Sequence, residues 1–222
     1  MIRRPRLLDL FCGAGGCSVG YYRAGFEVVG VDHRPMPRYP FKFHQADALA
    51  FVAAHGREFD VIHASPPCQV YSSTRTLPNM RKDHADLLGP ARKALIHSGR
   101  PWVIENVDRA PMCGIMLCGL MFGLRVFRHR LFESSELLLC PSHAGHGDKR
   151  VGRGIVCVAG NGGAHSTGWP PRRRPVPADH RNKAAWSRAM RIDWMTRDEL
   201  AQAIPPTYTE YVGRQLLNIL AR

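Results

Sequence analysis

The stretch "ASPPCQVYSS", residues 64–73, places a cysteine behind two prolines where the hydrophobic run "FDVIHA" ends. An isolated cysteine is most often buried packing material. Cys68, however, follows an expected strand at its carboxyl end, which is the edge where open α/β sheets bind ligands. Pro66 and Pro67 restrict the backbone there. A thiol is also very nucleophilic once it has lost its proton. These features make Cys68 a candidate nucleophile.

A glutamate and two arginines are candidates for acting with this cysteine. Glu105 lies in "VIENV", near the end of an apolar strand, where a charged side chain is costly without a partner or a task. Arg128 and Arg130 stand two residues apart in "FRHRLFE" and share a face if this piece is extended. Arginine suits fixed recognition of a carbonyl or carboxylate, although this pair could equally be surface charge. If the strands of Cys68 and Glu105 are neighbours, a nucleophile and an acid share one cleft.

A glycine-rich turn, "DLFCGAGGCSVG", follows the first expected strand and precedes a helix. Gly13, Gly15 and Gly16 would let the backbone approach a ligand at the helix N-terminus, although a tight structural turn is the alternative. Asp32 ends the second expected strand, where an acid can bind ribose hydroxyls. Asp47 in "HQADAL" could accept from an adenine amino group. Either acid alone is more often a helix cap or a solvated charge, but together with the turn they indicate an adenosine-containing cofactor.

Short apolar runs alternate with longer amphipathic segments over the first 107 residues. This alternation is typical of βαβ units around a largely parallel sheet. We predict helices over "CSVGYYRAGF", closed by Gly25, and over "GPARKALIHSG", with Pro90 in its first turn and Gly99 past its end. A final helix over 208–222 has an apolar stripe that should dock on the sheet. The predicted strands cover residues 6–11, 27–32, 60–65, 102–107, 130–134 and 154–159.

The chain is strongly basic, with a net charge of +13 over 222 residues. This charge indicates a nucleic-acid partner, with acidic membranes or a merely soluble basic surface as alternatives. Residues 134–191 hold ten Lys or Arg and only three Asp or Glu, which is over half of the net charge. They are also rich in Gly, Pro and His. We interpret them as an extended insert, against the alternative of a disordered basic loop.

Several classes of protein are disfavoured by the same sequence. No apolar run is long enough for a membrane-spanning helix, and Asp9 interrupts the only stretch that resembles a signal peptide. Seven scattered cysteines do not form a disulfide framework, so we expect reduced thiols, a cytoplasmic location and no membrane partner.

The cysteines and histidines of the second half were also considered as zinc ligands. The set Cys140, His143, His146 and Cys157 lacks the spacing of a standard zinc finger, with Cys113 and Cys118 as additional candidates. We therefore predict no metal site.

Four stretches together resemble the DNA (cytosine-5)-methyltransferase family. "LLDLFCGAGGCSVGYYRAGF" resembles its first motif, "SPPCQ" its catalytic loop, "ENV" its glutamate motif and "FGLRVFRHRLFE" its double-arginine motif. Their order and spacing also agree, and the likeness covers residues 6–133 and about 195–217. Two positions depart from the family: Val126 stands where Gln is usual, and Ala201 and Gln202 replace Gly-Asn. The compact form resembles phage-encoded members, which implies the cytoplasm of a bacterial or phage-infected cell.

The resemblance implies an α/β, Rossmann-like, S-adenosylmethionine-dependent methyltransferase with a mostly parallel sheet and a short basic target-recognition insert. Residues 1–133 would form the cofactor-binding and catalytic domain, 134–191 the target-recognition segment, and 192–222 a C-terminal part completing the catalytic domain. The implied catalytic residues are Cys68, attacking cytosine C6, Glu105 at N3 and Arg130 at O2, with Arg128 supporting them. The implied cofactor-binding residues are Phe11, Gly13, Gly15, Gly16, Asp32, Asp47 and Pro67.

The predicted activity is transfer of a methyl group from S-adenosylmethionine to C5 of a flipped cytosine in DNA. Arg172, Arg173 and Arg174 are expected to hold the DNA backbone, and the protein is expected to act as a monomer. The alternatives are a catalytically inactive DNA-binding module, C5 methylation of a free cytosine nucleotide or of RNA, and a nucleotide-linked oxidoreductase suggested by the glycine turn alone.

Overall fold

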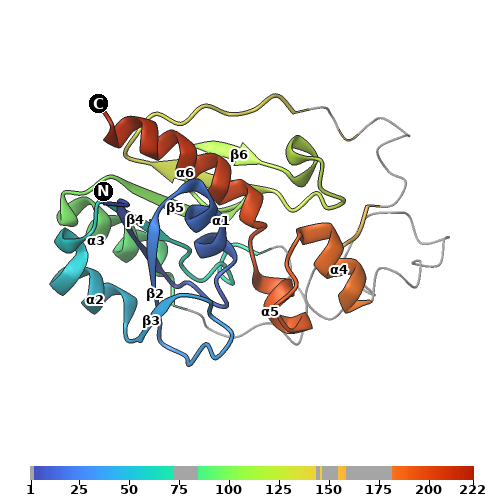
Figure 1. Ribbon diagram of the computed structural model, residues 1–222, viewed down its shortest axis with the longest axis horizontal. Helices are drawn as coiled ribbons and strands as arrows, with labels where there is room; N and C mark the ends of the chain where they lie inside the picture. Colours follow the sequence, from blue (N-terminus) through green and yellow to red (C-terminus); the bar gives the residue numbers. More distant parts are fainter. Residues whose placement is uncertain (1–2, 73–84, 144–145, 147–154, 159–181) are drawn as a thin grey trace.

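The structure is a computed structural model that describes residues 3–72, 85–143, 146, 155–158 and 182–222. Its centre is a seven-stranded sheet with the strand order β3-β2-β1-β4-β5-β7-β6 (Figure 1). The first five strands in this order are parallel, whereas β7 runs antiparallel to both β5 and β6. The strands are β1 (Arg6–Leu10), β2 (Glu27–Asp32), β3 (Lys42–Gln45), β4 (Val61–Ala64), β5 (Trp102–Val107), β6 (Ile115–Leu117) and β7 (Arg130–Ser134).

Helices cover both faces of this sheet (Figure 1). The helices are α1 (Gly16–Ala24), α2 (Ala48–His55), α3 (Leu88–Ser98), α4 (Lys183–Met190), α5 (Arg197–Gln202) and α6 (Pro206–Leu220), with short 3-10 turns at η1 (Gly56–Glu58) and η4 (Gly119–Phe122). α1, α4, α5 and α6 share one core and α2 and α3 the other. Because alternate strand residues point to opposite faces, Leu7 enters the first core and Leu8 the second. Burial on both faces explains why the central strands are continuously apolar.

The predicted strands at 6–11, 27–32, 60–65, 102–107 and 130–134 are all present. The predicted helices are present too, with Gly25 and Gly99 at the C-caps of α1 and α3. α6 buries Tyr208, Val212 and Leu216, packs chiefly on α1, and contributes to the core on that face of the sheet.

Two strands were missed, and one predicted strand is wrong within the described residues. β3 reads "KFHQ" and β6 has three residues, so neither edge strand carries the apolar run that marks the central ones. Residues 155–158, in the predicted strand 154–159, have no strand structure. Val156 and Val158 are nevertheless buried in the first core, and the Val156 N–H donates to the Arg125 carbonyl over 2.7 Å. The apolar run thus packs against the core without joining the sheet.

The expectation of an extended segment over 134–191 fails at its end. α4 lies within this range, and its Trp186, Ala189 and Met190 are buried in the core shared with α1 and α6. This spacing gives one apolar helix face, a pattern that the surrounding Gly- and Pro-rich composition obscured.

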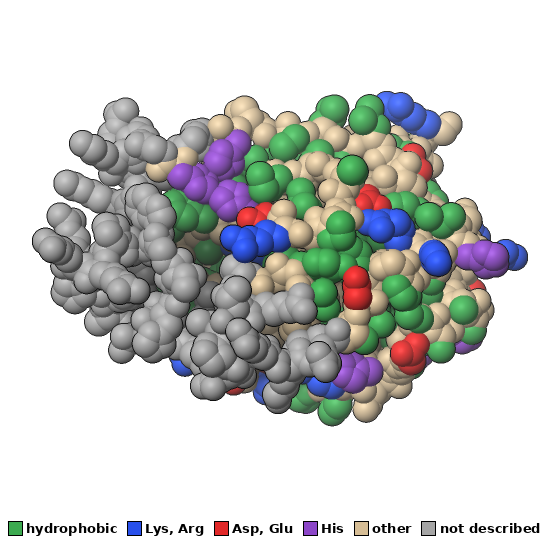
Figure 2. Space-filling view, turned by 180° about the vertical axis from the view of Figure 1, so that it is seen from behind, with side chains coloured by type: hydrophobic (Ala, Val, Ile, Leu, Met, Phe, Trp, Pro, Cys, Tyr) green, Lys and Arg blue, Asp and Glu red, His purple; other side chains and the backbone are tan. Residues whose placement is uncertain are grey.

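The surface of the described residues mixes charges of both signs with apolar and neutral groups on the face shown in Figure 2. Within the described part of the chain, no helix combines the length and the apolar character needed to cross a membrane.

Candidate active site

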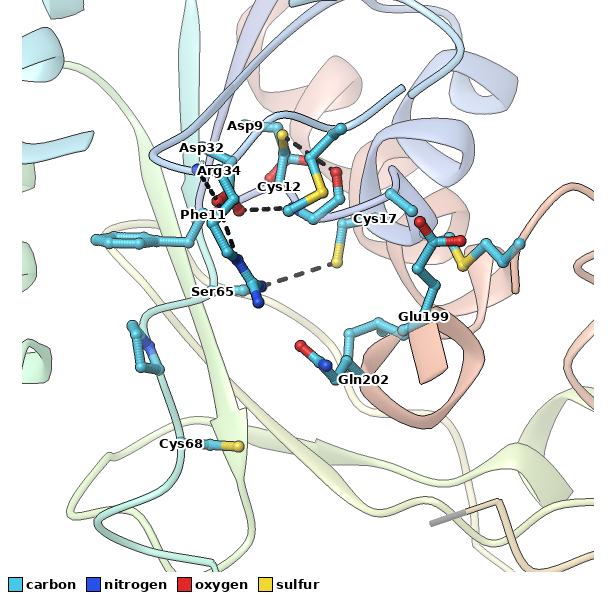
Figure 3. Close-up of a pocket in the computed structure, with 18 of the residues that line it drawn as sticks. Asp9, Phe11, Cys12, Cys17, Asp32, Arg34, Ser65, Cys68, Glu199 and Gln202 are labelled. Atoms are coloured by element: carbon cyan, nitrogen blue, oxygen red, sulfur yellow. Dashed lines mark hydrogen bonds and ion pairs between the residues drawn. The ribbon is translucent and has the colours of Figure 1, made fainter. Parts of the chain in front are cut away.

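A cleft of about 480 Å³ opens at the carboxyl ends of β1 and β4 (Figure 3). Strand order reverses between these two strands, which is where open α/β sheets bind ligands. The predicted site residues that line the cleft are Phe11, Gly13, Gly16, Asp32, Pro67, Cys68, Glu105 and Arg130. One cavity therefore joins the predicted nucleophile and acid to most of the predicted cofactor residues.

The three glycines of the turn after β1 serve different purposes. Gly13 has a φ of +50° and no atom within 4 Å of where a Cβ would stand, so it leaves open space beside the cleft. A Cβ on Gly15, whose φ is +87°, would lie 2.9 Å from Pro40 Cδ. A Cβ on Gly16 would lie 2.5 Å from the Ile204 carbonyl oxygen. Close packing thus requires glycine at positions 15 and 16, whereas Gly13 has open space beside it; Gly13 and Gly16 both line the cleft.

The two predicted acids differ in position. Asp32 is 5% exposed at the end of β2, and its carboxylate accepts hydrogen bonds from the Gly13 and Arg34 backbone N–H groups at 3.1 and 3.0 Å. It is therefore fixed at the cleft wall. Asp47 is exposed and does not line the cleft; its carboxylate caps α2 by accepting from the Ala50 N–H at 2.8 Å. An adenine contact from Asp47 stays a prediction.

The C-terminal part of the chain forms one wall of the cleft, and the sequence motifs predicted only some of its residues. Glu199 and Gln202, from α5, face β1 and β4 across the cleft (Figure 3). Glu199 forms an ion pair with Arg38 at 2.7 Å, which joins α5 to the segment after β2. Trp194 Nε1 donates to the Ala14 carbonyl at 2.8 Å, so the same region also fixes the glycine turn. Gln202 lines the cleft although it departs from the family's usual residue.

Cys68 lies on the loop after β4, half-buried, with its sulfur pointing into the cleft (Figure 3). The loop is held from the neighbouring strand because the buried Asn106 donates through Nδ2 to the Pro66 carbonyl at 3.0 Å. Burial raises the pKa of the Cys68 thiol, and Arg130 opposes this shift. Asn106 was part of the "ENV" motif, but only the structure shows its contact with the Cys68 loop.

Glu105 and Arg130 form the polar end of the cleft. β4 and β5 are adjacent, as the shared cleft required, and β5 places Glu105 with only 4% exposure. Arg130 Nε lies 3.1 Å from Glu105 Oε1. Burial raises the pKa of Glu105, while Arg130 and a hydrogen bond with Ser65 act in the opposite direction. A raised pKa suits a carboxyl group that holds a proton for transfer or hydrogen bonding.

Arg128 takes a different position from Arg130. The segment before β7 is not extended at Arg128, where φ is +34°, so the two arginines do not share a strand face. Arg128 does not line the cleft; it donates to the Val158 and Ala201 carbonyls, each at 2.8 Å. Burial lowers its pKa to about 9. Arg128 thus ties the segment before β7 to two other parts of the chain.

The histidine-rich region departs from the expectation of no metal site. Four potential ligands converge, Cys118, His129, His143 and His146, with ligand atoms all within 4.8 Å of one another. His129 was not among the candidates, and this group does not include Cys113, Cys140 or Cys157.

The predicted DNA contacts Arg172, Arg173 and Arg174 lie outside the described residues.

Asp9 is a further titratable group at the cleft, and it yields a prediction on stability. It is fully buried in β1 and accepts a hydrogen bond from the Ser18 hydroxyl, while Oδ1 has no partner among the described residues. Burial raises its pKa to about 7. Because the folded state then binds more protons than the unfolded state between about pH 4 and pH 7, Asp9 makes stability fall as pH rises.

The variant Asp9→Asn keeps the acceptor for Ser18 and removes this titration. We expect its free energy of unfolding to exceed that of the wild type by about 2–4 kcal/mol at pH 8, and the difference to shrink towards pH 4. Urea unfolding at pH 5, 6.5 and 8 measures it. The exposed Asp193→Asn serves as the control, and a difference from wild type that does not change with pH would contradict the assignment.

Comparisons with solved structures agree with this fold. The S. pombe Dnmt2 methyltransferase superposes with a TM-score of 0.63 at 15% identity, covering 99% of this chain and 100% of that one. A putative DNA modification methyltransferase from an E. coli prophage gives a TM-score of 0.58 at 16% identity, covering 98% and 100%. At these identities the likeness concerns the fold, which is that of a methyltransferase with a mostly parallel sheet.

Sequence comparison extends the likeness. The profile of the family described as "C-5 cytosine-specific DNA methylase" matches residues 5–110. Type II methyltransferase M.HgiDI of Herpetosiphon aurantiacus is 33% identical over 128 residues, which are 50% of this chain and 39% of that protein. M.HgiGI of the same organism is 34% identical over 128 residues, 50% of this chain and 96% of that sequence. The chain thus aligns with less than half of M.HgiDI and almost all of M.HgiGI. Because this chain aligns with almost all of M.HgiGI at 34% identity and the family profile matches residues 5–110, the chain belongs to the C-5 cytosine-specific DNA methylase family.

Proposed function

We propose that this protein transfers a methyl group from S-adenosylmethionine to C5 of cytosine in DNA, through a transient bond between Cys68 and cytosine C6. The observation that carries the proposal is that Cys68, Glu105 and Arg130 line the same cleft as Gly13 and Asp32. Nucleophile, acid and guanidinium thus stand beside a pocket of the kind that holds an adenosine. Membership of the C-5 cytosine-specific DNA methylase family supports the same reaction.

The pocket fits the cofactor by its chemistry. The fixed carboxylate of Asp32 can accept from ribose hydroxyls, and the open space at Gly13 admits the amino-acid part close to the backbone. Phe11, Pro67 and the α5 wall supply further contact surface. When bound there, S-adenosylmethionine supplies an electrophilic methyl group carried on a sulfonium.

Cys68 makes C5 of cytosine reactive. The aromatic ring alone is a poor nucleophile, so the thiolate of Cys68 adds to C6 while Glu105 gives a proton or a strong hydrogen bond to N3. Arg130 can hold O2 and keep Glu105 in place. C5, now enamine-like, would attack the methyl carbon and displace the sulfonium sulfur as a neutral thioether. Loss of the C5 proton to a base then expels the Cys68 thiolate and restores the aromatic ring.

The substrate base must leave the double helix to reach Cys68, because neighbouring bases cover both faces of a stacked cytosine. Unstacking costs a few kcal/mol, which contacts with phosphates can offset. We assign these contacts to the basic segment 134–191, including Arg172–Arg174, as the target-recognition part inserted between residues 1–133 and the C-terminal residues 192–222 that complete the catalytic domain. A monomer in the cytoplasm, where DNA is accessible, fits this role.

A direct assay tests the reaction. Purified protein, S-adenosylmethionine and unmethylated duplex DNA should yield 5-methylcytosine, detected by mass spectrometry of the digested DNA and located by bisulfite sequencing. An inactive DNA-binding module would retain DNA without forming product. Product formed on a free cytosine nucleotide or on RNA but not on duplex DNA would overturn the proposed substrate. Binding of NAD in place of S-adenosylmethionine would favour the oxidoreductase alternative.

A further inference from the structure

A cysteine and three histidines from separate parts of the chain converge beside the double-arginine segment. Cys118 precedes η4, His129 stands between Arg128 and Arg130, and His143 and His146 follow β7. The distance from Cys118 Sγ to His146 Nε2 is 3.5 Å, and from His146 Nε2 to His143 Nε2 it is 3.1 Å. Figure 2 shows a group of histidine side chains gathered on one face of the molecule.

These two separations are close to those of ligands around a tetrahedral zinc ion, and the whole group lies within 4.8 Å. Zn–N and Zn–S bonds of about 2.0 and 2.3 Å place two nitrogens about 3.4 Å apart, and a nitrogen and a sulfur about 3.6 Å apart. We propose that Cys118, His129, His143 and His146 bind one structural Zn²⁺ ion. One thiolate and three imidazoles suit zinc better than calcium or magnesium, which take oxygen ligands.

Neighbouring groups hold some of the four potential ligands in fixed positions, which favours metal binding. Cys118 is fully buried, and the Met121 backbone N–H donates to the Cys118 carbonyl at 3.0 Å, which holds this residue in place before η4. The His146 ring stacks on Phe127 with centroids 4.1 Å apart and an angle of 15°. This contact fixes the ring orientation, as the groups around metal ligands usually do. Binding would replace the thiol proton of Cys118 with the ion and release that proton.

The site would be structural because four protein ligands leave no open coordination position for a water molecule. It would tie the beginning of the segment 134–191, at His143 and His146, to Cys118 and to His129. His129 directly precedes Arg130, which contacts Glu105. The ion would therefore hold the start of the proposed target-recognition segment at a fixed position relative to the catalytic groups.

The test is the metal content of the protein purified without a histidine tag and without chelators. Elemental analysis should give about one zinc per chain for the wild type. The double variant His143→Ala/His146→Ala changes side chains outside the core. Its zinc content per chain should be lower than that of the wild type by about tenfold or more. Two matched controls, Cys140→Ser and the exposed His97→Ala, should retain it.

Cobalt substitution tests the sulfur ligand separately. Protein loaded with Co²⁺ should show the strong visible bands of a tetrahedral site and a thiolate-to-cobalt charge-transfer band that is absent in Cys118→Ser. Loss of zinc in Cys140→Ser would overturn the assignment of Cys118.

A wild-type protein that holds no zinc, or one whose zinc survives in the double histidine variant, would overturn the site. Retention of a different metal with the same dependence on these residues would overturn the zinc assignment. The inactive variant Cys68→Ala should carry the same zinc as the wild type, so this test does not depend on methyl transfer.

Discussion

Replacing Cys68 with Ala is expected to reduce methyl transfer to DNA by at least about 10³-fold. Without the thiolate, nothing adds to C6, and C5 stays part of an aromatic ring that cannot attack the methyl group. The measurement is transfer of a labelled methyl group to DNA under single-turnover conditions. Cys113→Ala, at an exposed cysteine outside the cleft, is the matched control and should keep wild-type activity.

A mechanism-based trap distinguishes loss of the nucleophile from loss of the fold. In DNA with 5-fluorocytosine at the target, the methylated adduct has no C5 proton to lose, so the bond to Cys68 persists. The wild type should form a covalent complex that survives denaturation, and Cys68→Ala should form none while binding S-adenosylmethionine with unchanged affinity. Covalent trapping by the alanine variant would show that another residue is the nucleophile.

Replacing Glu105 with Gln is expected to lower kcat by about 10²–10⁴-fold. The amide can still donate a hydrogen bond to N3, but it cannot transfer a proton and it loses the charge that pairs with Arg130. The matched control is Glu133→Gln, which breaks the 2.6 Å ion pair with Arg92 outside the cleft. Equal losses in both variants would mean that Glu105 acts only through the stability of the fold.

The pH profile separates the role of Glu105 from that of Cys68. Burial raises the pKa of the Glu105 carboxyl, whose protonated form is the active one, so the active fraction of Glu105 falls as pH rises through this pKa. Burial also raises the pKa of Cys68, whose thiolate is the active form, so the active fraction of Cys68 rises through that pKa. The rate follows the product of these two fractions and should therefore have a rising and a falling limb. Glu105→Gln should remove the falling limb of kcat and keep the rising one. A falling limb that persists unchanged would exclude Glu105 as the acid.

The main features of the site could be predicted from local sequence because β4 and β5 are adjacent and each carries its own motif. Cys68 and Glu105 follow from short stretches whose strands end at the same edge of the sheet. Arg128 could not be placed in the same way. Its separation from Arg130 depends on a positive φ and on carbonyls of Val158 and Ala201, which come from distant parts of the chain.

Other features of the site depend on contacts between distant parts of the chain and could not be predicted from local sequence. The contacts of Gly15 and Gly16 with Tyr39, Pro40 and Ile204 could not be read from the glycine-rich turn either, and cofactor contacts from these two glycines stay a prediction. The group of Cys118 with three histidines has no regular spacing, because η4, β7 and the segment after β7 each supply part of it. Such groups become visible only when the chain is folded.

The wall of the cleft formed by residues 195–204 has a consequence for the order of synthesis. The sheet strands and Cys68 emerge from the ribosome well before α5 does, so a nascent chain presents the proposed nucleophile in a half-open groove. Only when α5 docks and Glu199 meets Arg38 does the groove gain its second side. Tight binding of S-adenosylmethionine should therefore begin late in translation. A growing chain would not methylate DNA until α5 has been synthesised and has docked.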